Sequence, residues 1–205
     1  MKDKINPFVR ESLNRTCQEV RSFLPPDSLD KETKRKILRK YVAAIEGNFV
    51  SWMGAAAISA RSVQGRYAAS ENLWVEMRDD HAGMLRDFAR SAHCEPELED
   101  YQAISMAVGD IRGLVAELSG LGCLMLMAVL ESASGVFIPW LENTAKELGS
   151  TNLRYTQVHG EADIDHADQF AWAVTHEMAF YEDPEKILQE SARNTTCLLK
   201  VIFQI

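Results

Sequence analysis

The sequence predicts an all-α protein, built as a single bundle of seven helices. Apolar residues recur at three- and four-residue spacing through most of the 205 residues, which is the period of an amphipathic helix. No segment of useful length alternates between apolar and polar residues, so no β-strand is expected. Since no repeat or low-complexity linker divides the chain, one domain over residues 1–205 is predicted.

Proline, glycine and capping residues mark the ends of the expected helices. The predicted segments, in order, are Asn6 to Phe23, Asp30 to about Ala60, Tyr67 to Arg90, a helix opened by Pro96 that carries Tyr101 to Ile111, Ser119 to Leu148, Asn152 to about Phe180, and Pro184 to about Phe203. Pro25 and Pro26 stop the first of these, because proline cannot continue a helix. Asp30 is a good N-cap for the second. Pro139 should kink the fifth, and Gly149 should end it.

Composition and charge narrow the class of protein. The formal net charge is −8, which removes the general attraction for phosphate on which nucleic-acid binding depends. The four cysteines are scattered and form no CxxC pair, as is typical of reduced thiols in the cytoplasm. The charged N-terminal segment has no signal core. The apolar stretch from Leu118 to Leu141 contains Glu131, glycines and serines, so a buried core helix is expected there and no membrane span.

The segment from Tyr155 to His166 is the most informative about chemistry. Each helical residue advances by about 100°, so His159, Asp163 and His166 fall within an arc of about 60° on one face. Two imidazoles and a carboxylate on one stripe suit a divalent transition metal, and this mixed donor set favours iron or manganese over calcium. The alternative is a polar helix face whose histidines point to solvent.

Glu131 is the second candidate ligand. A helix that is apolar on all sides is buried, and an isolated buried carboxylate must protonate, pair with a cation or bind a metal. A neutral glutamic acid hydrogen-bonded in the core, or a pair with an arginine, would also explain it. His81 is the third candidate, because the apolar stripe that follows it indicates that it faces inward.

Glu76 is the best carboxylate partner for His81, although five residues on a regular helix separate two side chains by about 140°. A π-bulge would bring the two together. Glu71 is the fallback.

Taken in order, these motifs resemble those of the haem-oxygenase-like di-iron oxidases over roughly Glu71 to Glu177. Members of this family carry Asn-Leu-x-x-Glu followed by a histidine, then a lone glutamate on a middle helix, then His-x3-Asp-x2-His. The matching residues here are Asn72, Leu73, Glu76 and His81, then Glu131, then His159, Asp163 and His166. Some relatives use a glutamate from an earlier helix, for which Glu46 is the candidate. The resemblance implies a seven-helix haem-oxygenase-like domain.

The resemblance also implies two iron ions as cofactor and dioxygen as co-substrate. The small organic substrate would be oxidised by hydrogen abstraction, C–C cleavage or N-oxygenation. The resemblance suggests a substrate derived from an amino acid or a fatty acid. Tyr155 precedes His159 by one turn, so it could donate a hydrogen bond to a ligand or take part in redox chemistry, although it could equally pack in the core. A homodimer is compatible with this reading.

Three other readings remain open at this point. A ferritin-like di-iron bundle typically uses two Glu-x-x-His motifs, whereas this chain offers only Asp163-x-x-His166. A metal-free thiaminase-like hydrolase would share the helical fold and use cysteine and glutamate. A non-enzymatic helical interaction protein would consume no dioxygen and would not respond to chelators.

Overall fold

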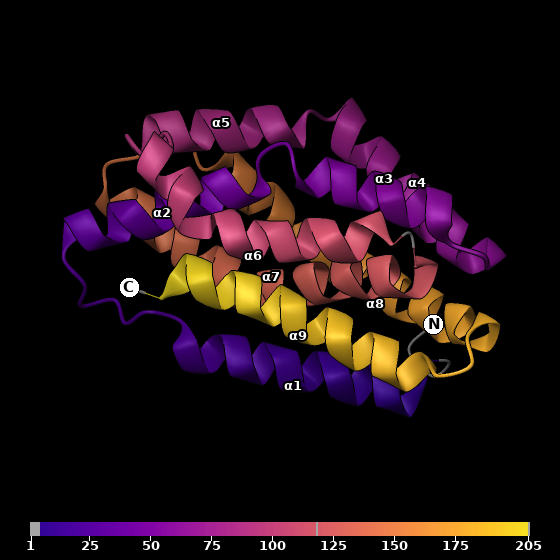
Figure 1. The fold of residues 1–205 in the computed structure, drawn as a ribbon. Helices are drawn as coiled ribbons and strands as arrows, with labels where there is room; N and C mark the ends of the chain where they lie inside the picture. Colours follow the sequence, from indigo (N-terminus) through magenta and orange to yellow (C-terminus); the bar gives the residue numbers. More distant parts are fainter. Residues whose placement is uncertain (1–4, 118, 205) are drawn as a thin grey trace.

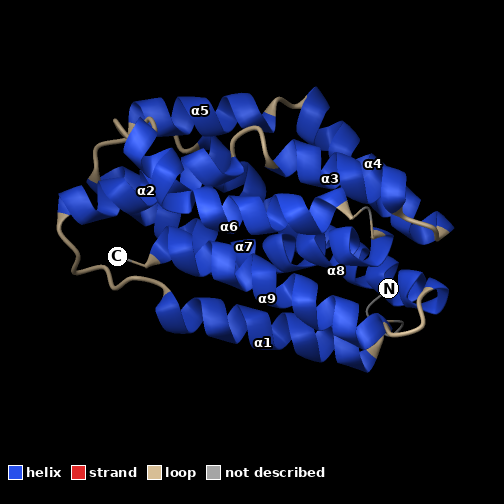
Figure 2. Cartoon of the chain, in the orientation of Figure 1, coloured by secondary structure: helices blue, strands red, loops and turns tan. Residues whose placement is uncertain are grey.

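The computed structural model describes residues 5–117 and 119–204, and the side chains of all of these except residues 161–164. Within these residues the chain forms nine α-helices and one short 3₁₀ helix, and none of them lies in a β-strand (Figures 1 and 2). The elements are α1 (Pro7–Phe23), α2 (Lys31–Ile45), α3 (Phe49–Ser59), α4 (Val63–Arg78), α5 (His81–Ser91), α6 (Leu98–Ala116), α7 (Gly120–Glu147), α8 (Arg154–Glu177), η2 (Met178–Phe180) and α9 (Pro184–Phe203).

The predicted all-α class is confirmed, but the predicted number of seven helices is wrong. Two of the expected helices are each broken in two. The segment from Asp30 to Ala60 is interrupted at Gly47, whose φ is +72°, and the segment from Tyr67 to Arg90 is interrupted at Asp80, whose φ is +51°. A single residue in the left-handed region ends the helical hydrogen-bond ladder, and apolar periodicity carries on across such a turn.

The most apolar helix, α7, forms the centre of the bundle. It packs against α1, α3, α8 and α9 (Figure 1). Its side chains from Leu121 to Leu130 are at most 3% exposed, because the rest of the protein covers the most apolar part of this helix. It is long and apolar enough to cross a membrane, but this burial supports the expected core helix of a soluble protein. The helix continues through Pro139 and ends just before Gly149, whose φ is +96°.

Polar side chains fix the helix starts as the sequence suggests. Asp30 accepts hydrogen bonds from the backbone N–H groups of Glu32 and Thr33, at 2.9 and 3.0 Å, and so caps α2 as predicted. Ser62 caps α4 by accepting from the Gly65 N–H at 2.9 Å. Helix α4 therefore begins at Val63, four residues before the expected start.

The turn between α3 and α4 is held by one buried carboxylate. Glu177, which is fully buried at the end of α8, accepts hydrogen bonds from the backbone N–H groups of Arg61 and Ser62, both at 2.8 Å, and from the Ser62 hydroxyl at 2.6 Å. A carboxylate that receives three hydrogen bonds is well compensated for its burial. This contact fixes α4 against α8, and these two helices carry the side chains described next.

Candidate metal centre

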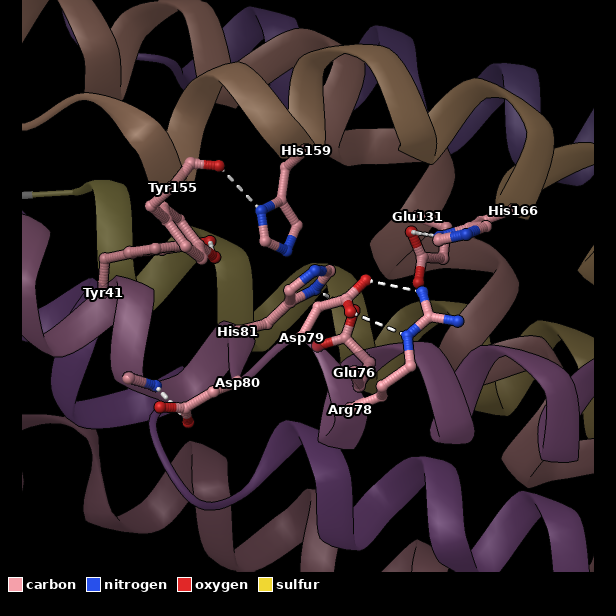
Figure 3. Close-up of polar contacts among 11 residues, drawn as sticks. Tyr41, Glu76, Arg78, Asp79, Asp80, His81, Glu131, Tyr155, His159 and His166 are labelled. Carbon is pink, nitrogen blue, oxygen red and sulfur yellow. Dashed lines mark hydrogen bonds and ion pairs between the residues drawn. The ribbon is translucent and has the colours of Figure 1, made fainter.

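The break between α4 and α5 brings Glu76 and His81 together. Glu76 lies in the last turn of α4 and His81 is the first residue of α5. The reversal at Asp80 places His81 Nδ1 2.6 Å from Glu76 Oε1, and both side chains are buried (Figure 3). The expected π-bulge is not formed, because Asp80 takes the left-handed conformation and its carboxylate caps α5 by accepting from the Gly83 N–H at 3.0 Å.

His159 on α8 approaches the same point from the other side. Its Nδ1 is 2.8 Å from the Tyr155 carbonyl oxygen, one helical turn earlier. This contact assigns the proton to Nδ1 and leaves the lone pair of Nε2 for a metal. The ring centroids of His81 and His159 are 4.7 Å apart. Burial lowers the pKa of His159, so the neutral, ligand-competent form prevails near pH 7.

Glu76, His81 and His159 therefore form one compact donor group. Each offers one nitrogen or oxygen atom, these atoms lie within 4.8 Å of one another, and all three residues are buried. Three helices contribute to this group, α4, α5 and α8. Buried carboxylate and imidazole groups that converge in this way are a typical site for a transition metal.

Glu131 and His166 form a second pair beside this group (Figure 3). His166 Nδ1 is 3.8 Å from Glu131 Oε2, an ion-pair distance. The other carboxylate oxygen, Oε1, is buried and has no hydrogen-bond partner among the described residues. Burial raises the pKa of Glu131. Burial pushes the pKa of His166 down, but the neighbouring Glu131 outweighs this and the pKa is raised overall. A buried carboxylate with an unpartnered oxygen is the state that a bound cation would relieve.

The other predicted site residues are placed as follows. The side chain of Asp163 lies outside the described residues, although α8 is helical through this position. Glu71 is exposed and does not join the group. Glu46 forms an ion pair with Arg86, at 3.2 Å.

Tyr155 is buried, with its ring centroid 4.2 Å from that of His159. Its hydroxyl lies 2.6 Å from the hydroxyl of Tyr41, on α2 (Figure 3). Tyr41 was not predicted as a site residue. Its four-residue spacing from Ile37 and Ile45 indicates that it faces inward, but nothing local shows that it meets Tyr155.

A small apolar cavity adjoins the donor group between α2, α5, α7 and α8. Its volume is about 40 Å³, and its walls include Phe49, Leu85, Leu130 and Phe137 together with Glu76, His81, Glu131 and His159. A buried water requires roughly 10–15 Å³ on this measure, so the cavity holds only a few small molecules. It is a mostly apolar approach to the donor atoms.

The residues fit iron. Two imidazoles and two carboxylates are buried, His166 is partly buried beside them, and the Oε1 atom of Glu131 has no partner among the described residues. Mixed nitrogen and oxygen donors of this kind suit iron and similar divalent metals, whereas calcium requires oxygen donors alone. The donor atoms of Glu76, His81 and His159 lie close enough together to hold one metal ion, and the pair of Glu131 and His166 lies beside them.

Comparisons with known proteins identify the family and the fold of the chain. Residues 38–197 match the sequence model of a family described as iron-containing redox enzymes. The crystal structure of a TenA homologue from Pseudomonas syringae pv. tomato is similar, with a TM-score of 0.65 and 13% sequence identity, covering 100% of this chain and 96% of that chain. At this identity the likeness shows the fold alone. No curated protein matches the chain.

Proposed function

Because the chain belongs to the family of iron-containing redox enzymes with a haem-oxygenase-like fold, we propose that it is a non-haem di-iron enzyme that uses dioxygen to oxidise a small organic substrate. The observation that carries this proposal is the convergence of Glu76, His81 and His159, whose donor atoms lie within 4.8 Å of one another in the buried interior. The reaction would be hydrogen abstraction, C–C cleavage or N-oxygenation.

In this proposal Glu76, His81 and His159 hold one iron, and Glu131, His166 and Asp163 hold the second. Bound ferrous iron would supply the electrons that activate dioxygen, which no side chain of the chain can do. The part played by the protein is to supply neutral imidazoles, charged carboxylates and a site from which water is excluded.

The residues around the donor atoms are suited to this part. The Tyr155 carbonyl orients the His159 ring and fixes its tautomer, as partners outside the ligand set commonly do. The lowered pKa of His159 keeps it free of a competing proton near pH 7. The hydroxyl pair of Tyr41 and Tyr155 stands at the wall of the apolar cavity and could pass a proton toward it.

A thiaminase-like hydrolase is the alternative that the shared fold leaves open. Such an enzyme needs a reactive thiolate, and thiolates form where the pKa of a cysteine is depressed. Burial raises the pKa of Cys17 and of Cys123, and raises that of Cys94 to about 12. None of these cysteines lines the apolar cavity, and Cys17, which lines a separate groove beside Glu131 and His159, has a raised pKa. The cysteine chemistry therefore favours the redox reading over the hydrolase reading.

The proposal extends to the cellular compartment and the partners of the enzyme. The four cysteines are free, which fits a reducing cytoplasm. The net charge of −8 argues against a nucleic-acid partner, and a homodimer is compatible with the family.

The test is dioxygen consumption by protein that has been loaded anaerobically with ferrous iron. His159→Ala should abolish consumption above the rate of free iron. His176→Ala is the matched control, because His176 lies on the same helix and its Nδ1 is likewise 2.9 Å from the carbonyl oxygen of Trp172, one turn earlier. Equal consumption by both variants and the unmodified protein would contradict the proposal.

A further inference from the structure

A row of exposed apolar side chains follows the outer face of α4. Val63, Tyr67, Trp74 and Met77 are 60% to 70% exposed, although valine and methionine are usually buried and tryptophan is usually largely covered. At about 100° per residue the four side chains fall within an arc of about 80°, and we call them the α4 stripe. The three large apolar side chains that α6 exposes spread over about 140°, so the α4 stripe is the more compact row.

The opposite face of α4 is the one that the bundle covers. Ala68, Asn72 and Glu76 are buried on that face, and α4 packs against α3 and α8 at the periphery of the bundle (Figure 1). The described part of the chain leaves all four side chains of the α4 stripe exposed. Monomeric proteins rarely expose contiguous apolar patches of more than a few hundred Å², and larger patches mark interaction sites. The α4 stripe therefore indicates a surface for a partner on the side of α4 that faces away from the donor group.

The spacing of the α4 stripe is symmetric about Ser70. Val63 and Met77 each lie seven residues from Ser70, while Tyr67 lies three residues before it and Trp74 four residues after it. An antiparallel second copy, related by a two-fold axis near Ser70, would place Val63 opposite the partner's Met77. It would likewise place Tyr67 opposite the partner's Trp74. Two-fold interfaces require this reciprocity, because residue i contacts residue j and residue j contacts residue i. A partner of different sequence would not require it, so the pattern favours a second copy of this chain.

The centre and the edges of the α4 stripe allow two copies to approach. Ser70 is a small residue at the centre, so no large side chain keeps the two helix backbones apart there. Arg66 and Glu71 flank the stripe with opposite charges, and Arg78 is paired with Asp79 at 2.8 Å. The exposed charges along α4 therefore cancel, although the whole chain has a net charge of −8. Long-range repulsion between two copies of this face is accordingly small.

The size of the α4 stripe suits a modest, reversible dimer. A fully buried aromatic side chain covers about 150–250 Å², so Tyr67 and Trp74, each 61% exposed, can bury roughly 180–300 Å² together in each copy. Val63, Met77 and the flanking polar side chains of both copies bring the total toward the roughly 1,000 Å² that a specific interface should reach. For an interface at this lower limit we expect a dissociation constant on the order of micromolar.

We propose that the chain forms a homodimer in which the α4 stripe packs antiparallel against the same stripe of a second copy. A homodimer of unstated geometry is compatible with the proposed function, and the α4 stripe supplies its interface. The inference does not rest on the di-iron function, because the stripe lies opposite the face of α4 that carries Glu76 and contains no donor group. The dimer can therefore be tested on metal-free protein and the function on iron-loaded protein.

Sedimentation equilibrium of the full chain over a range of concentrations measures the association, and we expect a reversible monomer–dimer equilibrium. Trp74→Glu should raise the dissociation constant by at least about 30-fold, the loss typical of an aromatic residue that dominates an interface. Met106→Glu is the matched control, because Met106 is 84% exposed on α6, which packs mainly against α2 and α9. It should leave the dissociation constant unchanged. Both positions are exposed, so neither change should unfold the chain.

Cross-linking tests the antiparallel register. In Ser70→Cys the two introduced thiols should face each other across the axis, at the Cα separation of roughly 4.4–6.8 Å that a disulfide requires. Oxidised glutathione should convert this variant into a covalent dimer that separates on reduction. The experiment uses a Cys197→Ser background, because Cys197 is exposed and could itself form a cross-link. Ser105→Cys introduces a thiol at an exposed position of α6, and this control should yield no covalent dimer.

Three results would overturn the proposal. The first is a chain that stays monomeric up to about 100 μM, where a dimer with a micromolar dissociation constant would be largely formed. The second is a dissociation constant that Trp74→Glu leaves unchanged, or that Met106→Glu raises equally. The third is equal cross-linking of Ser70→Cys and Ser105→Cys. A monomeric chain that consumes dioxygen when loaded with iron would leave the di-iron function standing, and a dimer that retains no iron would leave the interface standing.

Discussion

Glu131→Gln should stabilise the metal-free protein against unfolding, and it should reduce the further stabilisation that bound metal provides. In the folded chain the Glu131 carboxylate is buried, its Oε1 has no partner among the described residues, and its Oε2 is 3.8 Å from His166. Glutamine has nearly the same shape and no charge. His166 can release its proton when the carboxylate is removed, so the change leaves no isolated buried cation.

The direction of the pH dependence follows from the raised pKa of Glu131. The folded chain holds the proton more tightly than the unfolded chain, where the pKa has its ordinary value of 4.5. The stabilisation from this proton is fully present below pH 4.5 and is lost as the pH rises through the higher folded-state pKa. Glutamine cannot lose this proton. The advantage of the variant should therefore be absent at pH 4 and present at pH 8.

The magnitude is set by the negative charge that the buried carboxylate carries at pH 8 and that glutamine lacks. Leaving a buried polar group unsatisfied costs about 1–3 kcal/mol and more when the group is charged, so Glu131→Gln should raise the free energy of unfolding at pH 8 by about 1 kcal/mol or more. In a chain of this length 1 kcal/mol changes the melting temperature by roughly 2–4 °C. An increase of several degrees should therefore appear in thermal unfolding of metal-free protein. Glu142→Gln, which disrupts a half-exposed pair with Lys146 on the same helix, should produce no such increase.

Bound metal should make the unmodified protein more stable to heat than Glu131→Gln. A metal present at about 100 times its dissociation constant stabilises the folded state by about 2.7 kcal/mol, and Glu131→Gln should lose much of this gain. Thermal unfolding with and without ferrous iron, under anaerobic conditions, measures both effects. Two results would refute the reasoning about this carboxylate. One is a melting temperature of metal-free Glu131→Gln below that of the metal-free unmodified protein at pH 8. The other is an increase in melting temperature on adding iron that is as large for Glu131→Gln as for the unmodified protein.

Substitutions at three further contacts test the framework of the site by urea unfolding. Tyr41→Phe and Tyr155→Phe should each cost about 1 kcal/mol, and the double variant should cost less than the sum, because both remove the same hydrogen bond. Asp80→Asn should be nearly neutral, whereas Asp80→Ala should cost about 1–2 kcal/mol, because alanine neither caps α5 nor favours a φ of +51°. Glu177→Ala should cost about 2–4 kcal/mol, because it leaves the buried N–H and hydroxyl of Ser62 and the part-buried N–H of Arg61 without their acceptor. Additive tyrosine effects, a harmless Asp80→Ala or a harmless Glu177→Ala would each contradict the corresponding contact.

The sequence predicted the class of fold and most helix ends because both depend on local chemistry. Apolar periodicity identifies helices, and Asp30 and Gly149 mark ends that the structure reproduces. The two missed breaks show the limit of this reasoning. The apolar four-residue spacing continues from Ile45 to Phe49 across Gly47, and the left-handed conformation of Asp80, whose carboxylate caps the next helix, is not marked by any change in that spacing. The consecutive aspartates at 79 and 80 were the available signal for a new N-cap.

The residues of the candidate site could be proposed from the sequence, but their geometry could not. Helix α8 runs through His159 and His166, as the prediction of a shared helix face requires, while the side chain of Asp163 lies outside the described residues. In the folded chain the two histidines contact different residues. His159 lies close to Glu76 and His81, whereas His166 lies close to Glu131. The hydroxyl contact between Tyr41 and Tyr155 joins residues 114 positions apart, and no local pattern reports such a pairing.

The number of iron ions that the chain retains tests the central claim most directly. Metal-free protein would be titrated anaerobically with ferrous iron, freed of excess by gel filtration, and assayed for iron per chain. We expect two iron ions per chain in the unmodified protein and in His176→Ala, and no more than one in His159→Ala. Retention of no iron by the unmodified protein, or of equal amounts by all three, would contradict the account.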